Sequence, residues 1–167
     1  MWLSKVIVGM GLILLTACQW TPVYEKPEQK ADAVTAQVQI EPIPEEVGRI
    51  IRQQLINDLN PEDSDVKKKY TLTVSVSQED SHNLGIVGDN TATQAEMRLS
   101  AKYQLTETAT KKKLLSSSVR VASNYNILRK DPYATVTARE KTKKSLALML
   151  ADQIAVRVAE TLKQLKK

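Results

Sequence analysis

Few residues in this chain have side chains that could carry out chemistry. The 167 residues include one histidine, His82, and one cysteine, Cys18. Because His82 has no second histidine with which to share a transition metal, we expect a solvated residue in a polar loop. Asp80, Asp89 and Asn90 lie around two glycines, but their spacing does not fit a calcium-binding EF-hand loop. The sequence therefore predicts no metal site.

The sequence also lacks the patterns of covalent catalysis. Serines are abundant, but none lies in a Gly-x-Ser-x-Gly context, and the glycines do not form a phosphate-binding motif. No acids and bases are spaced so as to converge on one reacting atom. We therefore expect a protein that is not an enzyme, has no catalytic residues and needs no cofactor.

Cys18 is the residue whose surroundings do predict chemistry. Lys5 precedes an apolar run at residues 6–15, which is the layout of a secretory signal peptide. The sequence Leu15-Thr16-Ala17-Cys18 resembles the lipobox of bacterial lipoproteins, which implies that residues 1–17 are removed and that Cys18 carries lipid. The alternative is an uncut membrane anchor, but residues 1–17 fall short of the roughly 20 apolar residues that a span requires. Acyl chains, at about 0.8 kcal/mol per buried methylene, suffice for stable anchoring.

The residues after Cys18 predict a destination and a tether. Gln19 follows the cysteine, whereas an aspartate there commonly signals retention at the inner membrane in lipoprotein families. The resemblance thus implies the outer membrane. Residues 18–32 contain Pro22 and Pro27 and little hydrophobic periodicity, which predicts an extended tether. Residues 33–167 then have the length of a single domain.

Composition limits the partners and the means of stabilisation. The net charge is +5, which suits an anionic partner without identifying one. Nucleic acid is not expected in the compartment that a signal peptide implies. With a single cysteine there is no intramolecular disulfide, and with no phenylalanine the core must be built mainly from aliphatic side chains.

Hydrophobic periodicity predicts four strands and two helices. Alternation predicts strands at residues 34–41, 70–77, 96–105 and 115–125, the last two forming an antiparallel hairpin. Residues 78–90 are expected to be a loop or a hairpin tip. Steps of three and four predict helices at residues 44–59 and 133–165, the second capped by Asp131 and with first turns that project or bend. The expected inner stripe of the second helix is Ala138, Leu146, Met149, Leu150, Ile154, Val158, Leu162 and Leu165.

The order of the elements is β-α-β-β-β-α. Because the strands have one apolar and one polar face, both helices must cover the same face of the sheet. The predicted fold class is therefore α+β: a two-layer sandwich with a four-stranded, mostly antiparallel sheet, two helices on one face, and a second face that is free.

Three cations are expected on the free face, namely Arg98, Lys102 and Arg120. Together with neighbouring serines and asparagines they could bind phosphate or carboxylate groups, which arginine can do with two parallel hydrogen bonds. The alternative is that they only solvate the surface, with Arg98 paired to Glu96.

The pattern as a whole resembles the lipopolysaccharide-assembly lipoprotein family LptE. The resemblance covers about residues 21–165 and adds to the lipobox and element order four short sequences: Tyr70-Thr71-Leu72, Ser123-Asn124-Tyr125-Asn126, Asp131-Pro132-Tyr133-Ala134 and Leu150-Ala151-Asp152-Gln153-Ile154. It implies a non-enzymatic outer-membrane lipoprotein that plugs and helps to assemble the LptD β-barrel while lipopolysaccharide is delivered to the cell surface.

The family resemblance also implies lipopolysaccharide binding through basic residues near the strand loops. Residues 85–91 contain Asp89 and no lysine or arginine, so this chain departs from that pattern, and Arg98, Lys102 and Arg120 are the substitutes. Two other functions remain open: an auxiliary lipoprotein of an ABC-type or mammalian-cell-entry-type lipid transporter, and a pilotin-like assembly chaperone for a secretin.

Overall fold

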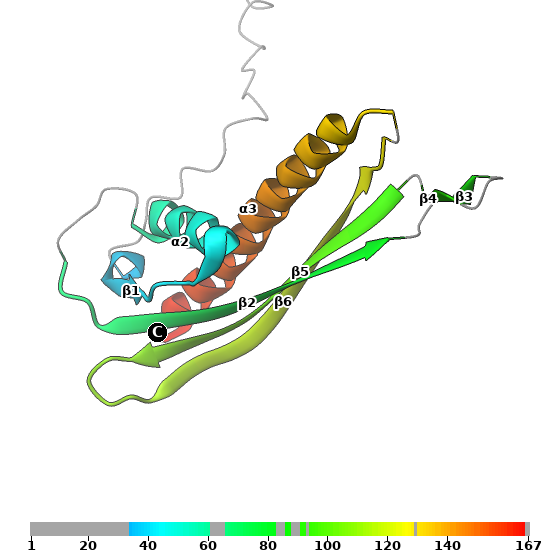
Figure 1. The fold of residues 1–167 in the computed structure, drawn as a ribbon. Helices are drawn as coiled ribbons and strands as arrows, with labels where there is room; N and C mark the ends of the chain where they lie inside the picture. Colours follow the sequence, from blue (N-terminus) through cyan, green and yellow to red (C-terminus); the bar gives the residue numbers. More distant parts are fainter. Residues whose placement is uncertain are drawn as a thin grey trace, which may run out of the picture.

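Two helices lie on one face of a four-stranded sheet (Figure 1). The computed structural model describes residues 34–60, 66–82, 86–87, 91–92, 94–128 and 130–165. The elements in chain order are η2 (Thr35–Gln37), β1 (Val38–Ile40), α2 (Glu45–Leu59), β2 (Tyr70–His82), β3 (Ile86–Val87), β4 (Thr91–Ala92), β5 (Gln94–Glu107), β6 (Lys113–Asn126) and α3 (Pro132–Leu165). The predicted signal peptide, Cys18 and the tether lie outside the described residues.

The sheet has the strand order β1-β2-β5-β6. β1 is parallel to β2, while β2 pairs with β5 and β5 with β6 in antiparallel registers. β3 and β4 form a separate small hairpin between β2 and β5. Because both helices cover the same face, the predicted α+β sandwich is confirmed, including its mostly antiparallel sheet.

Two strand boundaries differ from the prediction. Residues 35–37 form a 3-10 turn in place of the start of a strand, and β1 is only the three residues that pair with Tyr70, Thr71 and Leu72. The turn buries Thr35 and is held by Lys68, whose Nζ donates to the Ala36 carbonyl at 2.7 Å. β2, by contrast, is longer than predicted: it continues to His82, because residues 78–82 pair with residues 95–99 of β5. The expected loop around His82 is therefore wrong at its start: pairing with a strong neighbour extends a polar sequence as a strand.

The core lies between the helices and the inner face of the sheet. On β5 every second residue from Ala95 to Leu105 is buried, which confirms the predicted strand phase. From the helix layer, α2 contributes Ile51, Leu55 and Leu59 to the core, each at most 2% exposed. This burial against both helices is what holds the sandwich together, because the hydrophobic contribution scales with apolar area removed from water.

The buried residues of α3 differ in part from the predicted ones. Met149 and Leu165 are 47% and 53% exposed, so their expected burial is wrong. The buried stripe pairs large residues with small ones: Leu146, Ala147, Leu150, Ala151, Ile154, Ala155, Val158 and Leu162. Ala147, Ala151 and Ala155 lie on the opposite flank of the stripe from Met149, so the buried face of α3 is turned away from Met149.

The first turns of α3 are attached to the rest of the domain. Asp131 caps the helix, as predicted, by accepting a hydrogen bond from the Ala134 amide at 2.9 Å. Arg139 reaches Asp80 of β2 at 2.5 Å, and Lys143 reaches Glu46 of α2 at 2.9 Å. These ion pairs fix the long helix to both β2 and α2. No described helix is long and apolar enough to cross a membrane.

Candidate functional site

The face of the sheet that the helices leave free is lined with hydroxyl groups. Strand alternation directs toward it the side chains whose neighbours along the strand point into the core. Two adjoining shallow cavities of about 510 and 540 Å³ lie over this face, and their lining includes residues of β2, β5 and β6. The hydroxyl-bearing residues that line them on this face are Thr73, Ser75, Ser77, Ser100, Ser116 and Ser118. Such a surface is hydrated and rich in hydrogen-bond donors and acceptors.

Arg98, Lys102 and Arg120 lie together on this face, and we call them the cationic cluster. Arg120 of β6 is directly opposite Ser100 of β5 in the register. Arg98 and Lys102 are two residues to either side of Ser100 on the same strand. Both are therefore diagonal neighbours of Arg120 across the strand pair, a position at which Cα atoms are about 7–8 Å apart. The structure thus brings together the three cations that the sequence placed on one face.

The three cations differ in what they already contact. Arg98 forms an ion pair with Glu96, as the sequence analysis considered. Arg120 donates from Nε to the Ser100 hydroxyl at 3.2 Å and makes no ion pair within the part of the chain that the structure describes. Lys102 makes no ion pair with another described residue. Lys102 and Arg120, which both line the 510 Å³ cavity, are thus the cations available to an anionic ligand.

The chemistry that this face can perform is binding. A guanidinium and an ammonium group within reach of each other, with hydroxyls around them, can hold a phosphate through several charge-assisted hydrogen bonds. The serines here have no adjacent histidine to act as a base, since the single histidine is His82 at the end of β2. Among the described residues, no group of three or more His, Cys, Asp or Glu side chains could hold a metal ion.

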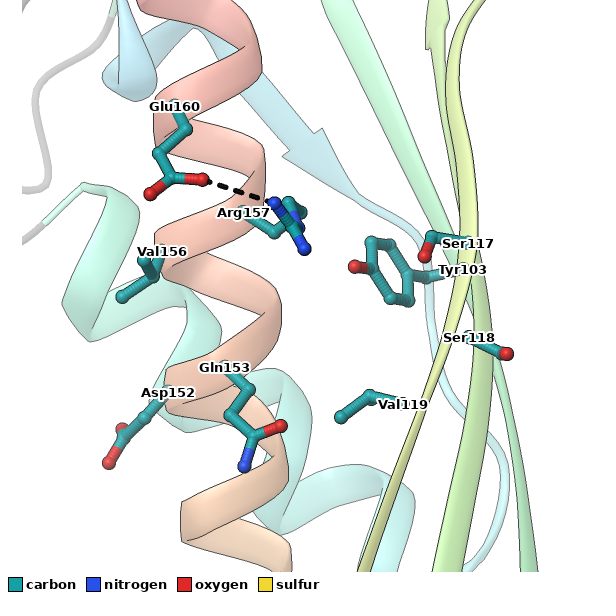
Figure 2. Close-up of a pocket in the computed structure, with 9 residues that line it drawn as sticks. All are labelled: Tyr103, Ser117, Ser118, Val119, Asp152, Gln153, Val156, Arg157 and Glu160. Carbon is teal, nitrogen blue, oxygen red and sulfur yellow. Dashed lines mark ion pairs between the residues drawn. The ribbon is translucent and has the colours of Figure 1, made fainter.

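A third cavity lies on the helix side of the sheet, between α3 and the edge strand β6 (Figure 2). We call it the edge groove. Its volume is about 500 Å³. Tyr103 and Val119 come from the sheet, while Gln153, Val156 and Arg157 come from α3. The sequence did not predict a groove on this side of the sheet. Its position depends on β6 being the last strand, and the order of strands in a sheet is not encoded in the alternation of any single strand.

A family model decides which group of proteins the chain is related to. The model named LptE, described as lipopolysaccharide-assembly, matches residues 35–158, which is most of the described domain. The chain belongs to the LptE family. The resemblance in the short sequence motifs is therefore confirmed at the level of the family.

Solved structures show the same fold for the LptE-family chain. Rare lipoprotein B from Shewanella oneidensis matches with a TM-score of 0.61 at 15% identity, covering 78% of this chain and 98% of that one. The minor lipoprotein from Acinetobacter baumannii matches with a TM-score of 0.60 at 16% identity, and the match covers 74% of this chain and 90% of the Acinetobacter chain. A protein from Caulobacter crescentus matches with a TM-score of 0.61 at 18% identity, covering 78% of this chain and 93% of that one. Among curated proteins, none matches the sequence significantly.

Proposed function

We propose that this LptE-family protein is a non-enzymatic outer-membrane lipoprotein, anchored by lipid on Cys18, that plugs and helps to assemble an LptD-type β-barrel. The observation that carries the proposal is the family match over residues 35–158. Relatives of the same fold described as lipoproteins support the anchor, as does the lipobox-like sequence that ends at Cys18. Residues 1–17 would be the signal peptide, residues 18–32 the tether and residues 33–167 the domain.

The free face of the sheet supports a place inside a barrel. Barrel lumens of the outer membrane are lined by polar side chains. A plug must therefore present a hydrated, hydrogen-bonding exterior while keeping a rigid interior. The hydroxyl-rich face supplies the first property, and the core shared by the sheet and both helices supplies the second.

The cationic cluster is the part of this surface that we assign to lipopolysaccharide. Phosphate groups of the glycolipid would be held by Lys102 and Arg120, with Arg98 alongside once its pair with Glu96 is exchanged for the ligand. The Arg98 side chain is 46% exposed, whereas that of Glu96 is 19% exposed, so a phosphate can reach the guanidinium from the solvent side.

Purification from outer membranes tests the proposed partner and anchor. We expect the full-length chain, labelled with radioactive palmitate in cells, to retain a large β-barrel protein through affinity purification. Cys18→Ala should abolish the label, because the thiol that accepts lipid is gone. Copurification with an inner-membrane permease or with a secretin would contradict the proposal and favour a lipid-transporter subunit or a pilotin instead.

Charge reversal tests the cationic cluster. We expect Lys102→Glu combined with Arg120→Glu to weaken lipopolysaccharide binding by the full-length protein at least about tenfold, because each lost charge-assisted hydrogen bond is worth about 1.5–3 kcal/mol. The control is Lys111→Glu with Lys112→Glu, which makes the same change in charge at the exposed turn between β5 and β6. Equal affinity in both double variants would show that attraction depends on net charge and not on this cluster.

A further inference from the structure

The edge strand β6 is open to pairing with another chain. It is the last strand of the sheet, and in the described part of the chain no segment pairs with its outer edge. Its pairing with β5 is regular from Leu115 to Asn126, with one irregularity at its start. In an antiparallel strand every second residue directs its amide and carbonyl away from the paired neighbour, so this edge offers a row of free donors and acceptors.

β6 also lacks the features that usually protect an edge. Natural edge strands are blocked by lysines, prolines, bulges or inward-pointing charges. Between Leu114 and Asn126 this strand has no proline or glycine, and Arg120 is its only charged residue. Arg120 points to the free face of the sheet and so leaves the edge itself unobstructed. A strand that is long, regular and almost uncharged at its edge is suited to receive another strand.

The edge groove lies where the side chains of an added strand would point. Extended peptides that join an exposed edge gain affinity from main-chain hydrogen bonds and specificity from pockets for alternate side chains. Figure 2 shows Val119 on the sheet side and Gln153 and Arg157 projecting from α3 toward the sheet. Val156 also lines the groove and is 45% exposed. The groove therefore has apolar surface that the fold itself does not cover.

The charges on the two sides of β6 indicate which residues an added strand would carry. On the groove side, Arg157 forms an ion pair with Glu160 at 3.5 Å, and Asp152 accepts a hydrogen bond from Gln54 at 3.3 Å. The apolar part of the lining, from Tyr103, Val119 and Val156, favours small aliphatic residues. On the free face, Arg120 is the only charged residue of β6 beyond Leu114, and a neighbouring hydroxyl could accept a hydrogen bond from its guanidinium while the cationic cluster stays open to phosphate.

From this geometry we propose that β6 receives an extended segment of the barrel partner, which joins the sheet as a fifth strand. The segment would place small aliphatic side chains in the edge groove and hydroxyl side chains beside Arg120. The inference rests on the proposed function, because it assumes a barrel partner. It goes further by naming the surface that holds the partner and the type of segment that binds there.

Hydrogen exchange in the purified complex tests the pairing directly. In the free full-length protein, about half of the amides in residues 115–126 should exchange fast, because they point away from β5. In the complex these amides should slow by about tenfold or more, since each now donates to the added strand. Amides of β5 between residues 95 and 105 are already paired with neighbours on both sides and should not change.

A pair of matched variants tests the groove. Val156→Lys puts a charged side chain into it, whereas Val136→Lys makes the same substitution at a 57% exposed valine in the first turns of α3. Both positions are solvent-accessible, so both variants should unfold at the wild-type temperature. We expect Val156→Lys to reduce the amount of barrel retained about fivefold or more and Val136→Lys to leave it unchanged.

The outcomes separate this inference from the function on which it rests. If the barrel is retained while the β6 amides exchange as in the free protein, the added strand is refuted and the proposed function stands. If no barrel is retained, both fail. If the β6 amides become protected in the isolated chain, together with a doubled mass, a second copy occupies the edge and the proposed partner is wrong.

Discussion

At the scale of single residues, Gly48 shows how one missing atom determines local packing. A Cβ at this position of α2 would lie 2.6 Å from the Ile43 Cγ2 atom and 2.8 Å from its carbonyl oxygen. Real atoms do not approach so closely, so glycine lets the segment before α2 pack against the helix. Ile43 is 4% exposed as a result and belongs to the core. Gly48 therefore has a packing role despite the low helix propensity of glycine.

Replacing Gly48 tests this role. Alanine is the better helix former by about 1 kcal/mol, but a methyl group forced against Ile43 costs about 1–3 kcal/mol. We expect Gly48→Ala to lower the free energy of unfolding by about 1 kcal/mol, measured by urea denaturation. Ser145→Ala, at an exposed position of α3, should instead be neutral or slightly stabilising. An increase in stability for Gly48→Ala would mean that the Ile43 segment moves freely.

The sequence predicts some single residues well and others not at all. The direction of Arg98, Lys102 and Arg120 follows from alternation alone, because every second side chain of a strand shares a face. The close approach at Gly48 could not be predicted, since it depends on the path that the chain takes after Pro42. Alternation is a local property, whereas contact between a helix and the segment leading into it is set by tertiary packing.

At the scale of elements, an ion-pair network joins α2 to α3. Lys143 of α3 contacts Glu140 at 2.5 Å and Glu46 of α2 at 2.9 Å. Hydrogen bonds to Glu140 and Glu46 raise the pKa of Lys143 above its ordinary value. The hydrogen bond to Lys143 lowers the pKa of Glu46 below its ordinary value of 4.5. The pair therefore stabilises the folded state at neutral pH, weakly, because Glu46 is largely exposed.

The pH dependence of this contribution has a definite sign. Since the pKa of Glu46 is lower in the folded than in the unfolded state, its stabilisation is complete above pH 4.5 and is lost as the pH falls through the lowered value. We expect Glu46→Gln to reduce the melting temperature by about 1–3 °C between roughly pH 6 and 8, with the difference disappearing in acid. Thermal unfolding across pH measures this. Glu45→Gln, at the neighbouring exposed position, serves as the control, and an equal pH-dependent loss there would point to a general charge effect.

Which elements form could be predicted, but not how they are arranged. Hydrophobic period distinguished strands from helices, because buried faces repeat every two or every 3.6 residues. The pairing of residues 78–82 with β5 could not be predicted, since the sequence from Gln78 to His82 has no apolar residue and the strand is held by its neighbour. The exposure of Met149 escaped prediction because alanines on the other flank of the apolar stripe of α3 are buried in its place.

At the scale of the whole molecule, every core residue that the structure describes comes after residue 33. The core residues extend from Val38 to Leu162. The backbone just before Val38 is fixed by η2, where the Lys68 Nζ donates to the Ala36 carbonyl at 2.7 Å. The two-layer design follows from strands with one apolar face, which is why the sequence predicts the whole fold better than the edge groove. The proposed function requires such independence, because the fold of a tethered plug must not rely on the lipid that we propose on Cys18.

Truncation tests whether the domain is independent in this sense. We expect residues 33–167 to unfold cooperatively at the same temperature as residues 18–167 prepared without lipid, because both contain every core residue that the structure describes. Residues 41–167 lack Val38 and Ile40, which are 5% and 7% exposed, together with the strand that covers Tyr70, Thr71 and Leu72. Losing two core side chains at about 1.5–3 kcal/mol each should lower the melting temperature by roughly 10 °C or more, or prevent folding. Scanning calorimetry distinguishes the cases. A clearly lower melting temperature for residues 33–167 than for residues 18–167 would show that residues 18–32 pack on the domain, and they could then not act as a free tether between the membrane anchor and the barrel.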